Sequence, residues 1–354
     1  MSNEDLVSNI VDDILGGNDI TENKPATPEA AVKKVFNVKA NKGQELYSSL
    51  FPMHETKLRD HAITVLKNKD IPQEVAAFVA TKDEHYVPPQ EATESILSAW
   101  EANDKTLISG NPGTGKSSLI QYLCAVTNRP FIRVNASGDM DSSHFFGQLV
   151  VEDGSTVWKD GPVTEAVRHG GVLLWDEWDV TPPEIAMTMQ WLLEEDGKLF
   201  LKEMPGTSLD KCITPHKDFR IVCSGNTLGQ GDETSQFAGT AVQNTASLDR
   251  FGTVVKLDYL APDLELELMQ NKVDGLNKTE GRKMIKVANI IRTSYEKGEI
   301  AITMSPRTLL SWARKFVYWD NIEDALRISF GNKLNQTDYK TLREVVNKVY
   351  AINI

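Results

Sequence analysis

Short apolar runs alternate with amphipathic stretches between residues 86 and 260, and this alternation predicts strands separated by helices. The apolar runs predict buried strands at residues 105–109, 130–135, 171–177, 219–224 and 253–257. From residue 261 the spacing becomes helical and predicts helices at about 262–274, 279–297, 306–317, 320–330 and 336–350. The pattern therefore predicts an α/β domain with a parallel sheet over residues 86–260, followed by an all-helical domain over residues 261–354.

Two β-hairpins are predicted to interrupt the α/β pattern. Residues 148–158 form two short runs around Asp153-Gly154, a dipeptide that favours a tight turn between strands. Residues 197–201 and 211–214 predict a second hairpin with a longer tip. A hairpin at the first position is unusual for a plain globular core, so we expect it to be an exposed insertion that touches a substrate.

The helix between these hairpins has a predicted start and a predicted buried face. The segment Thr181-Pro-Pro-Glu184 fits a capping box with proline at the first helical position, and the helix is expected to run to about Asp196. Apolar residues at helical spacing predict one buried face. Met187 and Trp191 are predicted to lie in the core rather than to bind a ligand.

The first 85 residues carry weaker patterns. Residues 1–30 are polar and acidic and predict a mobile tail, with a docking peptide for a partner as the alternative. Residues 31–85 contain moderately apolar pieces that predict a small mixed subdomain, whose role the sequence does not indicate.

Composition is that of a soluble globular protein, with 40% hydrophobic and 25% charged residues. The net charge of −12 argues against non-specific binding of nucleic acid over the whole surface. A local basic pore in an assembly is still compatible with this net charge. The three cysteines lie in or beside apolar runs, which predicts buried reduced thiols and a cytoplasmic location. The sequence contains no signal peptide and no apolar run near 18 residues, so no membrane span is expected.

Candidate chemistry begins with a phosphate-binding loop. Residues 110–117 match the pattern G-x-x-x-x-G-K-[ST] and lie between a predicted strand and a predicted helix. Glycines let several backbone N–H groups point at one anion, Lys116 can reach the β- and γ-phosphates, and the Ser117 hydroxyl can ligate Mg²⁺. The predicted nucleotide-binding residues of the loop are Gly110, Asn111, Pro112, Gly113, Thr114, Gly115, Lys116, Ser117 and Ser118.

Tyr86 and Val87 lie about twenty residues before this loop. They are positioned either to cover an adenine ring or to form an ordinary extended lead-in.

Acidic and amide side chains follow two of the later strands. Four apolar residues end in Asp176-Glu177, where Asp176 can help to hold Mg²⁺ and Glu177 can act as the general base for an attacking water. Asn226 follows the next strand and either orients that water or caps the turn. Arg307 lies in the first turn of a helix with Ser305 as N-cap, where a cation is unfavourable unless a phosphate is near or the arginine simply faces solvent.

These pieces, in this order, resemble AAA+ ATPases over about residues 86–317. The two hairpins resemble insertions of the MoxR and McrB groups, and the run from Asn226 to Arg250 resembles the CobS group of cobaltochelatase subunits. Trp175 departs from the family pattern, since a smaller residue usually precedes the two acids. Chains of the CobS group also occur in bacteriophage genomes, in which case the host cytoplasm is the expected location.

The resemblance implies roles for single residues and for the assembly. It identifies Lys116 and Ser117 with Walker A, Asp176 and Glu177 with Walker B, and Asn226 with sensor 1. It likewise identifies Arg307 with sensor 2 and Arg250 with an arginine finger offered to a neighbouring subunit, with pairing to a local acid as the alternative. It further implies ATP and Mg²⁺ as cofactors and a homo-oligomeric ring, typically a hexamer.

The leading functional hypothesis is a ring ATPase that remodels a protein partner or drives a chelatase-type complex. The partner implied by the resemblance carries a metal-dependent adhesion site, D-x-S-x-S, which this chain lacks. A DNA-directed motor or nuclease-associated NTPase is the alternative, and the acidic charge weighs against it. A nucleotide switch without turnover is disfavoured, because such a switch needs neither Glu177 nor Asn226 nor Arg250.

Overall fold

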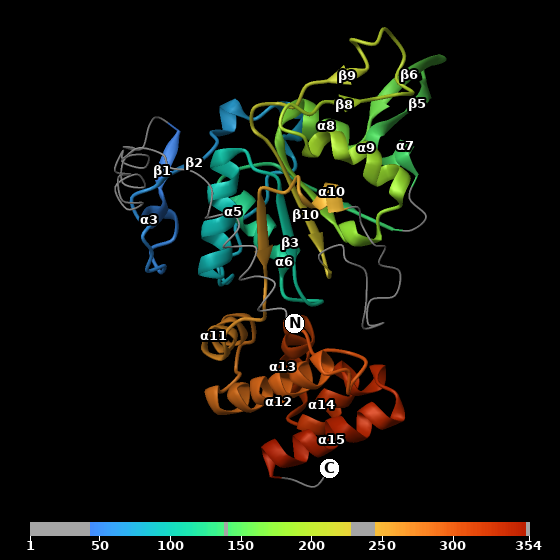
Figure 1. Ribbon diagram of the computed structural model, residues 1–354. Coiled ribbons are helices and arrows are strands. Elements are labelled where there is room, and N and C mark those ends of the chain that lie inside the picture. Colours follow the sequence, from blue (N-terminus) through green and yellow to red (C-terminus); the bar gives the residue numbers. More distant parts are fainter. Residues whose placement is uncertain (1–42, 138–140, 228–244, 352–354) are drawn as a thin grey trace, which may run out of the picture. The chain divides into compact units, whose positions relative to one another are not determined.

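The computed structural model describes residues 43–137, 141–227 and 245–351 (Figure 1). These residues form an α/β region around one parallel sheet and a separate group of helices at the carboxyl end of the chain. The predicted fold class is therefore confirmed. The predicted acidic tail, residues 1–30, lies outside the described residues.

The central sheet has five parallel strands in the order β11-β3-β10-β7-β4. Because the strands are parallel, their carboxyl ends meet at one edge, where the register pairs Gly225 with Ser109 and Asn135 with Asp176. The loops after β3, β7 and β10 therefore emerge side by side. The strands are β3 (Thr106–Ser109), β4 (Phe131–Asn135), β7 (Gly171–Asp176), β10 (Phe219–Gly225) and β11 (Thr253–Lys256).

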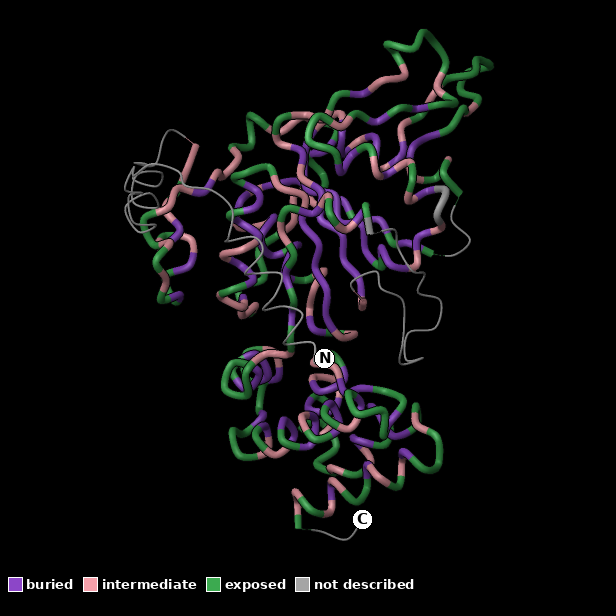
Figure 2. The backbone as a smooth tube through the Cα atoms, viewed as in Figure 1, coloured by how far each residue is buried: buried purple, intermediate pink, exposed green. Residues whose placement is uncertain are grey.

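The central strands of the sheet, β3, β7 and β10, are buried on both faces, as Figure 2 shows. Along β7, Leu173 and Trp175 point into one apolar cluster and Val172 and Leu174 into another, which is the period of two expected of a strand. The first cluster includes residues of α8 (Pro162–His169) and α9 (Pro183–Leu193). The second includes residues of α5 (Gln90–Ala102) and α6 (Lys116–Val126).

Trp175, the departure from the family pattern, fits because its polar atom has a partner. Its side chain is fully buried and its indole Nε1 donates a hydrogen bond to Thr181 Oγ1 at 2.7 Å. This contact also overturns the predicted capping box at Thr181. The N-cap of α9 is Pro182, no side chain caps it, and the helix ends at Leu193 rather than at Asp196.

The predicted burial of Met187 and Trp191 is wrong as well. Their exposed fractions are 65% and 62%, whereas Ile185, Met189 and Leu192 form the buried face of α9. Apolar residues occur all around this helix, so its sequence does not indicate which side faces solvent.

Both predicted hairpins are present. The first pairs β5 (Gly147–Glu152) with β6 (Ser155–Asp160) after the short helix α7 (Ser142–Phe146), and Val151 on it is 76% exposed. The second is shorter than predicted and pairs β8 (Leu199–Phe200) with β9 (Cys212–Ile213). All three cysteines are free thiols, and two are buried while Cys212 is half-buried.

The helices at the carboxyl end, which we call the lid, share an apolar core of their own. The predicted helices are confirmed with small shifts at their ends, and Ser305 caps the third by accepting a hydrogen bond from the Thr308 backbone N–H at 3.3 Å. The lid helices are α11 (Pro262–Lys272), α12 (Lys278–Glu296), α13 (Pro306–Trp319), α14 (Ile322–Ser329) and α15 (Gln336–Tyr350).

The described residues before α5 pack onto the α/β core. Tyr47, Phe51 and Ile63 belong to the same apolar cluster as residues of α5 and α6. His54 joins the same layer, since the Tyr47 hydroxyl lies 2.6 Å from its Nδ1. The regular elements here are β1 (Gln44–Leu46), α3 (Tyr47–Leu50), β2 (Ala62–Thr64) and α4 (Gln73–Ala76). No helix in the described part of the chain has the length and apolar character needed to span a bilayer.

Candidate active site

The phosphate-loop sequence forms the connection between β3 and α6. Gly115, with a φ of 95°, is the N-cap residue of α6, and Gly113 has a φ of 78°. A Cβ on Gly113 would also overlap with the side chain of Ser305 from the lid, so a larger residue would not fit. A glycine-rich loop with positive φ angles that leads directly into the N-terminus of a helix is a common anion-binding arrangement.

Lys116 lies at the start of α6 and reaches across the loop. Its Nζ donates hydrogen bonds to the Gly110 carbonyl oxygen at 2.7 Å and to Asn226 Oδ1 at 3.0 Å. Burial lowers the pKa of Lys116, and nearby negative charges, of which Asp176 contributes most, oppose this effect. The contact with Asn226 brings together two residues that are 110 positions apart in the sequence.

Asp176, at the carboxyl end of β7, is buried and has a partner on each oxygen. Ser117 Oγ donates to its Oδ2 at 2.6 Å, Arg133 lies 2.5 Å from the same oxygen, and the Ser224 hydroxyl donates to Oδ1. Burial alone would raise the pKa of Asp176, but these hydrogen bonds and the Arg133 charge outweigh it and lower the pKa. The group therefore stays ionised.

The donor set beside the loop fits Mg²⁺. A carboxylate oxygen and a hydroxyl oxygen meet at 2.6 Å, and oxygen ligands of this kind are those that Mg²⁺ prefers. Among the described residues there is no cluster of three or more metal-ligating side chains. Mg²⁺ commonly takes one or two protein ligands and completes its shell with water and phosphate oxygens.

Glu177 follows directly and has an unusual backbone. Its φ of 58° lies in the left-handed region, which costs a non-glycine residue roughly 1–2 kcal/mol, and its side chain is exposed. Strained residues of this kind often occur at functional sites. The side chain is therefore free to meet a ligand at the edge of the sheet where β3, β7 and β10 end.

Asp179 is a further site residue that the sequence analysis missed. It is fully buried, and its Oδ2 accepts hydrogen bonds from the backbone N–H groups of Asn226 at 2.9 Å and Thr227 at 3.0 Å. It thus fixes the turn that carries Asn226. The only sequence signal is an acid three positions beyond Asp176, which is too common to be informative alone.

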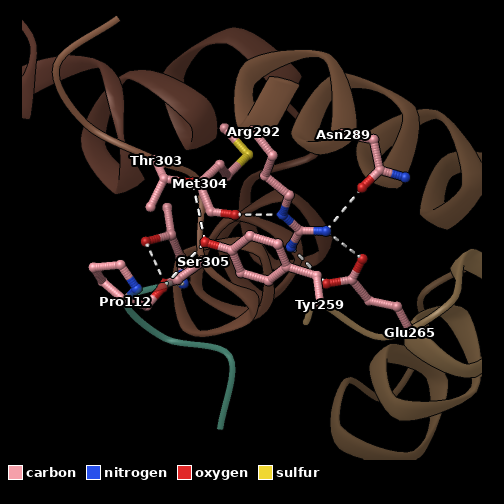
Figure 3. A network of polar contacts seen from close by, with 9 residues as sticks. Pro112, Tyr259, Glu265, Asn289, Arg292, Thr303, Met304 and Ser305 are labelled. Atoms are coloured by element: carbon pink, nitrogen blue, oxygen red, sulfur yellow. Dashed lines mark hydrogen bonds and ion pairs between the residues drawn. The ribbon is translucent and has the colours of Figure 1, made fainter. Parts of the chain in front are cut away.

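Residues of the lid and of the linker before it approach the same loop (Figure 3). Besides Ser305 at Gly113, Tyr259 donates a hydrogen bond from its hydroxyl to the Pro112 carbonyl oxygen at 3.1 Å. Arg307 lies two residues beyond Ser305 in the first turn of α13, and its side chain is exposed. The structure therefore brings the start of the helix that carries Arg307 to the loop, and Arg307 makes no hydrogen bond to the described loop residues.

Tyr86 and Val87 lie at the start of the α/β region and are half-buried. The Tyr86 ring packs against Tyr122 of α6 at a centroid distance of 4.8 Å, and a Cβ on Gly115 would lie 3.8 Å from the Tyr86 hydroxyl. Burial raises the pKa of Tyr86, so the hydroxyl stays protonated. Tyr86 is therefore a neighbour of the phosphate loop.

Arg250 makes its contacts elsewhere. Its Nε lies 2.7 Å from Glu194 Oε1, and its guanidinium donates a second hydrogen bond to the Ala246 carbonyl oxygen at 2.7 Å. This is the local pairing that the sequence left open as the alternative to a finger. Because both partners of the ion pair are partly exposed, we expect the pair to contribute little to stability. Arg250 can therefore leave Glu194 for another partner at little cost in free energy.

The geometry defines a P-loop nucleoside triphosphatase, and comparison with known proteins identifies its family. Residues 105–239 match the AAA domain (dynein-related subfamily). The chain is 33% identical over 286 residues to the aerobic cobaltochelatase subunit CobS of Sinorhizobium sp, a match that covers 78% of this chain and 85% of that protein.

Two further relatives are more distant. The putative chaperone BssE of Thauera aromatica is 28% identical, with 69% of this chain and 79% of that protein covered. Protein CbbQ of Hydrogenophilus thermoluteolus is 24% identical, with 62% and 77% covered. The chain belongs to the AAA+ ATPases of the MoxR/CobS type.

Proposed function

We propose that this chain is a Mg²⁺-dependent ATPase that works as a ring and remodels a protein partner. The observation that carries the proposal is the meeting of Lys116, Ser117 and Asp176 with Asn226 at one edge of the sheet. These groups come from the ends of three adjacent parallel strands, where α/β sheets bind their ligands.

Each side chain has a chemical task in this proposal. The N–H groups of the loop and the Lys116 ammonium bind the β- and γ-phosphates, and Tyr86 and Val87 cover the adenine. Ser117 and Asp176 would hold Mg²⁺, which when bound neutralises charge on the phosphate oxygens. The Glu177 carboxylate accepts a proton from the attacking water, and Asn226 orients that water. Arg307 approaches the γ-phosphate from the lid.

In the proposed ring, a neighbouring subunit supplies a further cation to each nucleotide. Arg250 is proposed to leave Glu194 and to reach the nucleotide of the neighbouring subunit, where an arginine can be worth roughly 10³–10⁵ in rate. The weak, partly exposed pair with Glu194 makes this exchange inexpensive. A hexamer is the proposed assembly.

A protein partner is proposed from the relatives, two of which are a chelatase subunit and a putative chaperone. The resemblance to the CobS group implies a partner that carries a metal-dependent adhesion site, D-x-S-x-S, a pattern that this chain does not supply. The exposed hairpin β5–β6, with Val151 at its surface, is the proposed contact.

Steady-state ATP hydrolysis and nucleotide binding test the enzymatic part. We expect Lys116→Ala to lose nucleotide binding, and Glu177→Gln to bind ATP but lose turnover, because only the proton acceptor is removed. Matched controls are Lys297→Ala and Glu267→Gln, two exposed lid residues, which should behave as wild type. Normal turnover in Glu177→Gln would remove that residue from the role of base.

The Glu177→Gln protein also tests the partner, because it should hold ATP and so stay in the partner-bound state. It would be used with ATP to recover bound proteins from the native source. Recovery of a protein with a D-x-S-x-S site supports remodelling, whereas recovery of a nuclease or of DNA would replace it with the motor hypothesis.

A further inference from the structure

A network of polar contacts joins the phosphate loop to the lid (Figure 3). Its centre is Tyr259, in the linker between β11 and α11. The Tyr259 hydroxyl donates to the Pro112 carbonyl oxygen at 3.1 Å and lies 3.1 Å from Thr303 Oγ1. Because a carbonyl only accepts, the single phenolic hydrogen goes to Pro112 and Thr303 is the donor in the second bond.

The Tyr259 ring is held from behind by a buried ion pair. The Arg292 guanidinium lies 4.0 Å from the ring centroid and is paired with Glu265 through two hydrogen bonds of 2.7 and 2.8 Å. Its Nε also donates to the Met304 carbonyl oxygen at 2.8 Å. The exposed fractions of the Arg292 and Glu265 side chains are 4% and 1%. The ring therefore cannot turn without disturbing a fully paired buried network.

The bond to Pro112 acts on a peptide group of the phosphate loop. In a planar trans peptide the C=O and the following N–H point in opposite directions, and the described residues contain no cis peptide. Holding the Pro112 carbonyl toward Tyr259 consequently turns the Gly113 N–H to the other side of the loop. Burial raises the pKa of Tyr259, so its hydroxyl stays protonated and able to donate.

The second bond leads to the lid. Thr303 lies two residues before Ser305, which caps α13, and four before Arg307. One hydroxyl thus contacts both the loop and the segment that begins α13. A change in the orientation of the Pro112–Gly113 peptide therefore disturbs the Tyr259 hydroxyl, which also contacts Thr303.

We propose that Tyr259 is a positioning residue that couples nucleotide on the phosphate loop to the placement of the lid segment 303–307. This inference rests on the proposed function only in that nucleotide binds at this loop. Tyr259 touches neither the phosphates nor the water in this proposal, and acts through the Pro112–Gly113 peptide and through Thr303.

Tyr259→Phe tests the proposal, because it removes the hydroxyl and keeps the ring over Arg292. The matched control is Tyr318→Phe, which removes a hydroxyl from a lid side chain that is 85% exposed. The full chain would be titrated with ADP, and amide hydrogen exchange of residues 303–309 would be measured with and without ADP. Thr303→Val serves as a second variant, which removes the lid side of the same contact.

We expect Tyr259→Phe to bind ADP roughly three- to tenfold more weakly, as the loss of one hydrogen bond predicts. It should also lose the ADP-dependent protection of residues 303–309, and Thr303→Val should lose that protection too. Tyr318→Phe should match wild type in both measurements. Wild-type ADP affinity together with full protection in Tyr259→Phe would overturn the coupling and leave the proposed function standing.

A purely structural role gives a different result. In that case Tyr259→Phe would be less stable without nucleotide but would keep the full protection by ADP, and this result would also overturn the coupling. If wild-type protein itself fails to bind ADP, the proposed function falls, and the inference falls with it.

Discussion

Replacing Asp179 by asparagine changes little in shape but removes a negative charge that is fully buried at the centre of the site. In the wild type, Oδ2 accepts two backbone hydrogen bonds, at 2.9 and 3.0 Å, and the Thr227 hydroxyl lies 3.2 Å away. Oδ1 has no hydrogen-bond partner among the described residues. The amide can keep its oxygen toward the turn, so the geometry survives while the charge is lost.

The bond count sets the size of the effect. A hydrogen bond to a charged group contributes about 1.5–3 kcal/mol and one between neutral groups about 0.5–1.5, so each backbone bond weakens by about 1 kcal/mol. The two backbone bonds predict that Asp179→Asn lowers the free energy of unfolding by about 2 kcal/mol, and weakening of the third bond, from the Thr227 hydroxyl, adds to this loss. Asp179→Ala removes the acceptor altogether and leaves the half-buried N–H groups of Asn226 and Thr227 without this partner, which predicts a loss of up to about 4 kcal/mol.

We also expect Asp179→Asn to slow ATP hydrolysis by more than the unfolded fraction of the protein would account for. The turn held by Asp179 presents Asn226, whose Oδ1 accepts a hydrogen bond from Lys116 at 3.0 Å. If about 1.4 kcal/mol of the lost interaction acts on the transition state, hydrolysis falls about tenfold. Nucleotide binding should persist, because the loop keeps its own contacts to Lys116.

Urea unfolding and steady-state hydrolysis of Asp179→Asn measure the two effects separately. Asp274→Asn, at an exposed position in the lid, is the matched control and should leave both unchanged. Wild-type turnover in a folded Asp179→Asn protein would refute the idea that this carboxylate positions Asn226. A fall in activity that only follows the unfolded fraction would refute it as well.

Two further predictions concern the assembly and the pH dependence of stability. Arg250→Ala and Lys116→Ala should each be inactive in ATP hydrolysis. Mixed assemblies of the two variants should recover activity, because an intact Arg250 of one subunit meets an intact Lys116 site of its neighbour. If demonstrably mixed assemblies recover no activity, Arg250 is not the arginine finger. Burial lowers the pKa of His54, so the unfolded state binds its proton first and the unfolding free energy should fall as pH drops below about 6.5. His54→Gln should flatten this fall between about pH 7 and 5 in urea unfolding, and an unchanged slope would contradict the assignment.

The neutral ring of His54 also follows from its contacts. Pro88 offers only a carbonyl oxygen, at 3.2 Å from Nε2, so Nε2 carries the hydrogen. The Tyr47 hydroxyl then donates to Nδ1 at 2.6 Å. Protonation would place a hydrogen on Nδ1, the atom that accepts the hydrogen bond from Tyr47. The bond would be lost within a buried layer, which disfavours the protonated ring.

Periodicity predicted the strands and the lid helices because each buried face repeats along the chain, as the split of β7 between two apolar clusters illustrates. The same signal failed on α9, where apolar residues surround the helix and Trp191 proved exposed. The capping box failed for a different reason. The Thr181 hydroxyl is taken by Trp175, a contact that local sequence rules do not include.

For the candidate site, motif spacing predicted the residues that directly follow strands in the sequence. It could not predict residues whose role depends on contacts with distant parts of the chain. Asp176 and Asn226 each follow an apolar run, and Lys116 belongs to the glycine-rich motif after another, which makes all three visible in the sequence. Asp179 and Tyr259 are recognisable only through their partners, Asn226 and Pro112, which lie 47 and 147 positions away. Such contacts depend on the order of strands in the sheet, which the sequence pattern leaves open.

That strand order links the parts of the site to one another. β10 lies between β3 and β7, so the turn after β10 has the phosphate loop on one side and the acids after β7 on the other. Asn226 accordingly meets Lys116 through its side chain and Asp179 through its backbone. A substitution after β7 therefore reaches the lysine after β3 through one intervening residue, and this path is why Asp179→Asn should slow hydrolysis while leaving the phosphate loop itself intact.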